Sequence, residues 1–455
     1  MVGTVCVGAF MGQLDASIVT LAFPTLQRDF GASLGAVTWV GLSYLLVLVG
    51  LVAAVGSFAD MVGRKLLYIY GFIVFIAGSA LCGFAPNLAV LDGFRVLQAV
   101  GAAMLQANSV AIIALAMPRD KLGRGIGIQG AAQALGLALG PSAGGLLIAL
   151  GGWRLIFFVN VPVGIVGAVL GWFFIPRSRH LRPRHRVDWA GLAMFLPAIV
   201  ALLYAISFGD ENGWSSAGII GPLAAALVLA GAFVVRERRA PRPMLDLSLF
   251  RRVTFSAGVL SGLLSYVVIF GSLFVMPFYL ERALKLSPGI TGLELTTVPV
   301  ALGIVAVFAG RAADRFGARP LTVMGMLVCA AMLGFLAAGH PSGAGLLLPL
   351  AGLGAGLGLF VPPNNAAIMG SAPRHHAGAA SGVLNMTRGL GTALGLALTG
   401  LVFDLGAGVN AAGPRVGQGF TDSVVFLAVV ALAAAAVAAM RGGGELELHK
   451  APGAE

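Results

Sequence analysis

Fourteen apolar stretches, each long enough to cross a lipid bilayer, run through this 455-residue sequence. A helix needs about 20 mainly apolar residues to span the hydrocarbon core, and only helices and closed barrels satisfy the backbone there. The stretches are long and do not alternate, which favours helices. The sequence therefore predicts an all-α integral membrane protein with 14 transmembrane helices. They lie near residues 4–24, 36–58, 66–84, 88–116, 124–149, 153–175, 188–208, 216–235, 254–280, 289–312, 318–339, 344–370, 376–405 and 421–440.

The positions of the basic residues predict the topology. A formal charge of +11 would indicate a nucleic-acid partner in a soluble protein, but most of these Lys and Arg residues fall in alternate loops. If the N terminus is cytoplasmic, the positive-inside rule is obeyed. We therefore expect a multi-pass protein of the cytoplasmic membrane with both termini inside and no nucleic-acid partner. The outside loops hold Arg28, Arg154, Arg282, Lys285 and Arg415.

A short polar segment between the second and third apolar stretches recurs later in the chain. We call the two copies the first and second hinge. A repeat of this kind predicts two related halves, and the contacts of such a turn can hold one conformational state and release in the other. The first hinge is built on Gly56, Asp60, Gly63, Arg64 and Lys65. The second keeps the same spacing at Gly310, Asp314 and Gly317, followed by Arg319.

The hinges also divide the chain into parts. The first hinge follows the second span and the second hinge follows the tenth, so two extra spans must separate two six-span halves. We predict an N-terminal half at residues 1–176, a two-helix insert at 177–240, and a C-terminal half with a short cytoplasmic tail at 241–455. The two halves are expected to be pseudo-symmetric.

Four further stretches complete a set of motifs. They are L-D-A-S-I-V-T-L-A-F-P at 14–24, R-V-L-Q-A-V-G at 95–101, G-P-S-A-G-G at 140–145 and W-R-L-I-F-F-V-N-V-P-V-G at 153–164. Together with the hinges they resemble the major facilitator superfamily, and within it the fourteen-span drug:proton antiporter branch. The resemblance implies multidrug efflux and antibiotic resistance through proton-coupled antiport, powered by the proton gradient without a cofactor or metal.

Asp15 and Arg95 carry charge inside predicted spans. A charged side chain at the bilayer centre costs about 2.5–3.5 kcal/mol on insertion scales, so Asp15 should face the bundle interior and either pair or take up a proton. The resemblance implies that Asp15 and Arg95 couple transport to protons. For both residues the alternative is a structural role, with hydrogen bonds to neighbouring helices.

The G-P-S-A-G-G stretch is the third conformational element. Small residues let two helix backbones approach closely, and an internal proline permits a bend. The resemblance associates this element with antiporters, while tight helix packing is the simpler interpretation. The residues concerned are Gly140, Pro141, Gly144 and Gly145.

Polar and aromatic residues at membrane depth are the candidates for the substrate cavity. We expect an amphipathic small molecule as cargo, with a cationic compound among the alternatives, carried by a monomer. Glu294 could attract a cation or be an interfacial acid, and Arg388 could instead stabilise packing or a gate. The candidates are Gln13, Tyr44, Gln98, Gln106, Asn108, Gln133, Phe270, Phe274, Glu294, Asn364, Asn365, Asn385 and Arg388.

Two other functions compete with multidrug efflux. One is a transporter with narrow specificity for a single metabolite. The other is an integral membrane enzyme, which would need a catalytic pair at membrane depth. His376 is the first residue of a predicted span, and the other five histidines lie outside the spans. The sequence therefore favours a secondary transporter over an enzyme.

Overall fold

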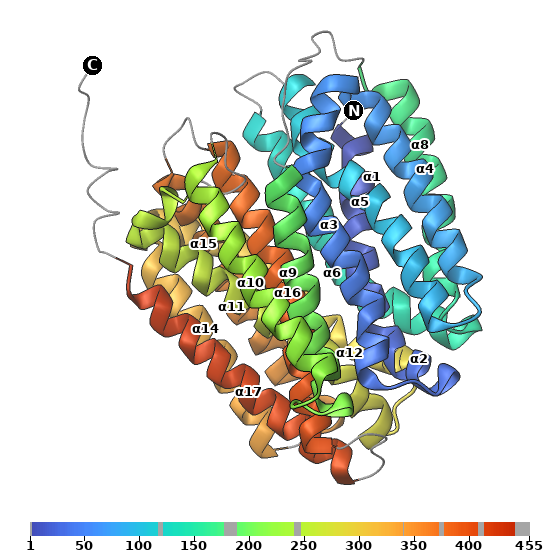
Figure 1. The fold of residues 1–455 in the computed structure, drawn as a ribbon. Helices are drawn as coiled ribbons and strands as arrows, with labels where there is room; N and C mark the ends of the chain where they lie inside the picture. The colour runs from blue at the N-terminus through green and yellow to red at the C-terminus, as the bar shows by residue number, and fades with distance from the viewer. Residues whose placement is uncertain are drawn as a thin grey trace.

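A computed structural model describes residues 2–116, 122–176, 189–240, 247–339, 341–372, 377–407 and 414–441. The side chains of the two hinge acids, Asp60 and Asp314, lie outside the described residues. Within these ranges, 14 helices are long and apolar enough to cross a membrane (Figure 1). The predicted all-α fold with 14 spans is therefore confirmed.

The first six spans form one bundle. A 3-10 turn, η1 (Val19–Ala22), links the first two helices into one long span. Helix α1 lies inside this bundle and packs against α5, α6 and α8, while α4 packs against α5 and α8. The helices are α1 (Val2–Ile18), α2 (Phe23–Phe30), α3 (Leu34–Val62), α4 (Arg64–Gly83), α5 (Leu88–Ala116), α6 (Leu122–Gly151), α7 (Leu155–Phe158) and α8 (Asn160–Phe174).

The last six spans form a second bundle. Helix α11 is at its centre and packs against α15, α16 and α17, and α14 packs against α15 and α17. A 3-10 turn, η3 (Leu249–Arg251), precedes α11, the π-helical η4 (Tyr279–Ala283) follows it, and the 3-10 turn η5 (Gly343–Leu346) precedes α15. The helices are α11 (Val253–Phe278), α12 (Pro288–Leu295), α13 (Thr297–Phe316), α14 (Ala318–Gly339), α15 (Leu347–Ser371), α16 (Ala377–Ala407) and α17 (Pro414–Ala439).

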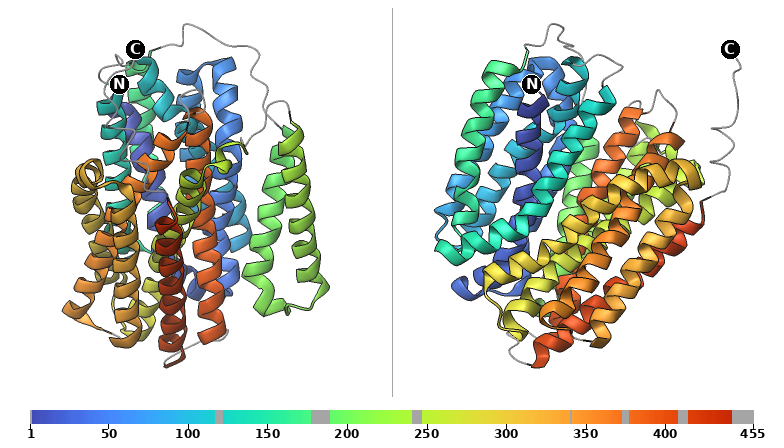
Figure 2. Two further views of the ribbon diagram at one scale, coloured as in Figure 1. Left: turned by 90° about the vertical axis from the view of Figure 1, so that its left-hand side faces the viewer. Right: turned by 180° about the vertical axis from the view of Figure 1, so that it is seen from behind.

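Two helices lie beside these bundles. Helices α9 (Trp189–Asn212) and α10 (Ala217–Arg239) pack mainly on each other, and the left view of Figure 2 shows them as a separate pair. Helix α9 also contacts α3 and α16, one helix from each bundle. The start of the predicted insert, residues 177–188, lies outside the described residues. The exact three-part division of the chain stays a prediction.

The two bundles touch at one end and diverge at the other, as the right view of Figure 2 shows. At the touching end, which we call the closed end, the rings of Phe23 and Phe274 lie 5.5 Å apart. Arg282 there donates a hydrogen bond of 2.8 Å to the side chain of Gln27 in the other bundle. The bundles diverge toward the end that holds the N terminus and the first hinge, which we call the hinge end.

In each hinge, a single glycine separates two consecutive helices. Gly63 separates α3 from α4 with φ of 110°, and Gly317 separates α13 from α14 with φ of 81°. The Gly63 N–H donates to the carbonyl of Ala59 at 2.9 Å, and the Gly317 N–H donates to that of Ala313 at 2.8 Å. Residues with a side chain rarely adopt such positive φ values, so both turns depend on glycine.

Candidate functional site

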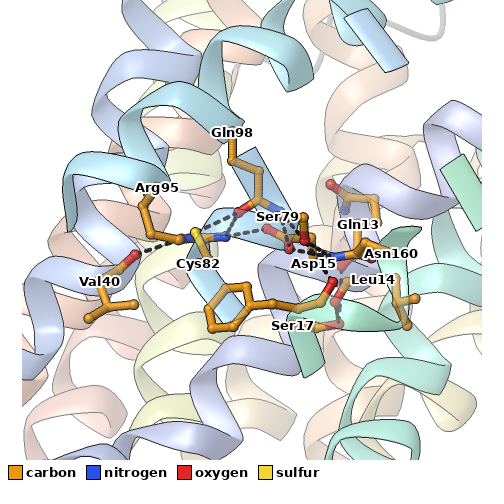
Figure 3. Close-up of polar contacts among 11 residues, drawn as sticks. Gln13, Leu14, Asp15, Ser17, Val40, Ser79, Cys82, Arg95, Gln98 and Asn160 are labelled. Atoms are coloured by element: carbon orange, nitrogen blue, oxygen red, sulfur yellow. Dashed lines mark hydrogen bonds and ion pairs between the residues drawn. The ribbon is translucent and has the colours of Figure 1, made fainter. Parts of the chain in front are cut away.

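Asp15 lies at the centre of a buried polar network in the first bundle (Figure 3). Its side chain is fully buried. One carboxylate oxygen accepts a hydrogen bond of 2.7 Å from Arg95, which is also the ion pair between the two residues. The other accepts from Gln98 at 2.8 Å and from Asn160 at 3.0 Å. Helices α5 and α8 thus supply every donor that holds this acid.

Arg95 is equally well enclosed. It is 1% exposed, and its Nε donates to the backbone carbonyl of Val40 on α3 at 2.9 Å. Arg95 and Gln98 are three residues apart on α5, which places both on one helix face, and a 2.7 Å hydrogen bond joins them. The guanidinium carbon lies 4.2 Å from the ring centroid of Tyr44, a favourable cation–π contact.

The sequence did not predict two members of this network, Ser79 and Asn160. Ser79 on α4 accepts hydrogen bonds from Gln98 at 3.2 Å and from Asn160 at 3.1 Å, and donates to the carbonyl of Phe157 at 2.8 Å. Asn160 lies within the W-R-L-I-F-F-V-N motif, and a lone amide in an apolar run was the available signal. A Cβ on Gly78 would lie 2.6 Å from the backbone of Gln98, so glycine here lets α4 and α5 approach.

Burying an ion pair is favourable only when the remaining donors and acceptors are satisfied. Here the carboxylate receives three hydrogen bonds and the guanidinium makes three, so the pair is held by four helices of one bundle. The sequence left pairing or proton uptake open for Asp15, and in this structure Asp15 pairs with Arg95.

A central cavity of about 210 Å³ lies between the two bundles. The first bundle contributes side chains from α1, α3 and α5, and the second contributes from α11 and α16. Five of the predicted candidates line it: Gln13, Gln106, Phe270, Asn385 and Arg388. The other lining residues are Gly12, Ala16, Leu45, Leu48, Val49, Val52, Gly382, Met386, Gly389 and Thr392.

The remaining candidates lie outside this cavity. Gln98 belongs to the Asp15 network, and Asn108 donates to the carbonyl of Met104 on its own helix. Phe274 packs at the closed end between Phe23 and Phe278. Asn364 bonds Arg441 and the carbonyl of Gly258 inside the second bundle. Three others are half-buried and off the cavity lining: Gln133 on α6, Glu294 on α12 and Asn365 on α15.

A small void borders both the Asp15 network and the cavity. It has a volume of about 10 Å³ and is lined by Tyr44 and Arg95 among others. Ala16, Leu45, Phe270 and Thr392 line both the void and the cavity. A space of about this size accommodates one water molecule. Asp15 itself does not line the cavity, so contact between cavity and ion pair passes through Arg95 and Tyr44.

The G-P-S-A-G-G stretch on α6 faces two neighbours at once. A Cβ on Gly140 would overlap Ser17, and one on Gly144 would lie 2.9 Å from Ile18, so these glycines fit against the end of α1. One position further along the helix, Pro141 and Gly145 face α12 of the other bundle. A Cβ on Gly145 would overlap the carbonyl of Pro288, and one on Gly292 would overlap that of Pro141. The stretch therefore forms part of the closed end.

The described polar side chains of the hinges, Arg64, Lys65 and Arg319, are not part of the cavity lining. Lys65 donates a 2.6 Å hydrogen bond to the carbonyl of Trp172, which ties α4 to α8 beside the first hinge. A Cβ on Gly310 would meet open space, whereas a Cβ on Gly56 would lie 3.9 Å from the Cβ of Ala107. The carbonyl of Arg319 accepts a hydrogen bond from Thr322 at 2.9 Å. Arg64 begins α4 directly after the first hinge glycine.

The comparisons with known proteins agree with this architecture. The family model described as Major Facilitator Superfamily matches residues 5–396 and 258–442. This chain belongs to the major facilitator superfamily. It is therefore a multi-pass membrane transporter of small molecules and not an enzyme. The fold also resembles a crystal structure titled a bacterial homolog of the human lysosomal transporter Spinster, with a TM-score of 0.74 and 16% identity over 99% of this chain and 98% of that one.

Two curated relatives show the range of cargo among similar transporters. One is the multidrug resistance protein Stp of Mycobacterium tuberculosis (strain CDC 1551 / Oshkosh), 35% identical over 87% of this chain and 74% of that protein. Another is the riboflavin transporter RibZ of Clostridioides difficile (strain 630), 33% identical over 86% of this chain and 85% of that protein.

Proposed function

We propose that this transporter exports amphipathic small molecules across the cytoplasmic membrane in exchange for protons, with Asp15 as the proton-binding group. The observation that carries the proposal is the position of Asp15. It is a fully buried acid at membrane depth, paired with Arg95 and separated from the central cavity by a void of about 10 Å³. Intramembrane acids of this kind are typical of proton relays.

The proposed cycle uses the charge of Asp15 as a switch. Protonation of Asp15 cancels the ion pair and leaves Arg95 with the carbonyl of Val40 and the side chain of Gln98. The loss weakens the contact between α1 and α5, and so favours a different packing of the first bundle. One water in the void would give the proton a path between cavity and Asp15, and Tyr44, whose hydroxyl lacks a hydrogen-bond partner among the described residues, would bond that water.

Alternating access supplies the transport step. The bundles are closed together at the end formed by α2, α6 and α12, and they diverge at the hinge end (Figure 2). Rocking the bundles about the central cavity would open the closed end and close the other. The proton gradient drives the cycle, and a transmembrane potential adds about 2.3 kcal/mol per moved charge per 100 mV.

A transporter of one metabolite is the second candidate function. The similarity to a riboflavin transporter supports it, as do the four polar uncharged side chains that line the cavity: Gln13, Gln106, Asn385 and Thr392. Several fixed hydrogen-bonding groups in one cavity favour a defined substrate over a variable one.

Everted membrane vesicles with a preformed proton gradient test the proposal. A pH-sensitive dye reports loss of the gradient when amphipathic anions, neutral compounds, cations or riboflavin are added. We expect a substrate-triggered loss with wild type that falls at least tenfold in Asp15→Asn. Asp29→Asn is the matched control, because Asp29 is a partly exposed acid at the end of α2.

Each other outcome changes the proposal in a defined way. A response that persists in Asp15→Asn would retain antiport but remove Asp15 as the proton-binding group. A response to riboflavin alone would establish the single-metabolite function. No response to any compound with wild type would contradict proton antiport of amphipathic molecules.

A further inference from the structure

We propose that the central cavity selects substrates that carry a negative charge, and that Arg388 is the residue that recognises this charge. The inference rests on the proposed function and names the substrate class of the same cavity. It reverses the cationic alternative considered from the sequence, where Glu294 was the acid that could attract a cation.

The charge of the cavity lining is the first observation. Among the described residues that line the cavity, Arg388 is charged and none is an acid. Asp15 follows Gln13 by two residues, yet it lies outside the lining, and Arg95, Gln98 and Asn160 occupy its oxygens. Glu294 lies on α12, at the closed end. A cationic substrate in this cavity would therefore meet a like charge without a compensating carboxylate from the described residues.

The surroundings of Arg388 are the second observation. Its side chain is half-buried on α16, and it makes one long hydrogen bond of 3.4 Å to the amide oxygen of Asn385. Among the described residues, no carboxylate lies within ion-pair distance of its guanidinium. Arg95 in the other bundle makes three bonds by comparison. Most N–H groups of Arg388 thus have no partner among the residues that the structure describes and can bind a ligand.

The chemistry of a guanidinium at the edge of an apolar space defines the ligand. Its planar fork matches a carboxylate with two parallel hydrogen bonds, which are stronger than bonds between neutral groups. Leu45, Leu48, Val49 and Phe270 form an apolar surface in the same cavity. A flat apolar body with one carboxylate or comparable anionic group would satisfy both parts of the site.

Three compounds on one scaffold separate charge from shape: 1-naphthoate, 1-naphthamide and 1-naphthylmethylammonium. Binding to the purified full chain in a non-ionic detergent is measured by equilibrium dialysis without a proton gradient, with empty micelles as the blank. We expect naphthoate to bind wild type at least tenfold more tightly than the ammonium compound.

Variants of Arg388 then assign the preference to one residue. In Arg388→Gln the affinity for naphthoate should fall about tenfold, the loss expected for one charged hydrogen-bonding group, while the affinity for naphthamide stays within about twofold. Arg388→Lys keeps the charge and should restore part of the affinity. Arg28→Gln is the matched control, because it removes one positive charge from an exposed position.

The outcomes distinguish this inference from the function on which it rests. Binding of naphthamide or of the ammonium compound without a preference for naphthoate would overturn the anion selectivity and leave amphipathic transport intact. An equal loss for all three compounds in Arg388→Gln and Arg388→Lys would reduce Arg388 to a structural role. If none of the three bound wild type, the cavity would not be an amphipathic site, and the proposed function would lose its substrate site as well.

Discussion

Arg95 and Arg388 are arginines at membrane depth, one in each bundle, and they are held in opposite ways. Arg95 is 1% exposed, and its hydrogen bonds go to an acid, an amide and a backbone carbonyl. Arg388 is half-buried, faces the central cavity and makes one long bond to Asn385. An arginine is therefore paired with an acid inside one bundle and faces the central cavity from the other.

This difference shows how two related bundles can take separate tasks. A buried charge must be paired inside the protein, because leaving it unpaired is strongly destabilising. A charge at the edge of a cavity can be satisfied by water or by a ligand instead. The first bundle thus holds a group that can bind a proton, and the second presents a group that can bind cargo.

The largest expected effect is on stability, when each of the two arginines is replaced separately by methionine. Arg95→Met would leave the Asp15 carboxylate buried without a cation, which costs about 3–5 kcal/mol of the free energy of unfolding. Arg388→Met should change it by about 0.5 kcal/mol, the usual effect of a position without buried partners. Thermal and denaturant unfolding of the purified proteins in one detergent measure both values.

A double variant controls for the size of the replaced side chain. In Asp15→Leu with Arg95→Met no buried charge is left, so most of the lost stability should return. Equal destabilisation by Arg95→Met and Arg388→Met would contradict the comparison, because it would mean that both arginines have structural roles.

The two hinges should respond alike to mutation, because each depends on one glycine with positive φ. Gly63→Ala and Gly317→Ala each force a side chain into positive φ, which costs about 1–3 kcal/mol. Gly310→Ala is the matched control. A Cβ at Gly310 meets open space within α13, so this change should be neutral or stabilise by up to about 1 kcal/mol. The same unfolding measurements apply, and clearly unequal costs at Gly63 and Gly317 would show that the hinges differ.

The smallest effect on stability is expected at Tyr44, which lies beside Arg95 and lines the small void next to the cavity. Tyr44→Phe keeps the ring that packs on Arg95 and removes a hydroxyl without a hydrogen-bond partner among the described residues. Stability should stay within about 0.5 kcal/mol. Substrate-triggered gradient loss should slow by about two- to tenfold, the effect of one lost hydrogen bond to a relaying water. An unchanged rate would exclude the hydroxyl from the proton path.

The fold and the two buried charges were predicted from the sequence, but the pairing of these charges with each other was not. Apolar stretches of sufficient length can only become buried helices in a bilayer, and the hinge glycines mark where two of those helices must break. Asp15 and Arg95 were found because charge is rare and costly at membrane depth. These inferences rest on the large free energies of placing apolar and charged groups in a bilayer, so they do not depend on how the helices pack in detail.

Contacts that depend on the rotation of a helix about its own axis could not be predicted from the sequence. Gln98 was predicted to line the cavity, yet it turns toward Asp15, because the face that α5 presents is set by packing against α1 and α4. Arg441 directly follows the last predicted span, where the sequence predicts the short cytoplasmic tail. In the structure it is 1% exposed and bonds Ser261 and Asn364 inside the second bundle.

The seam between α6 and α12 has a consequence for the speed of the cycle. At Pro141, Gly145, Pro288 and Gly292 the two helices meet backbone to backbone. These four positions carry only proline rings or no side chain, so closing the contact there orders few rotamers and carries little entropic penalty. A single bulky residue in place of either glycine would hold the two helices apart.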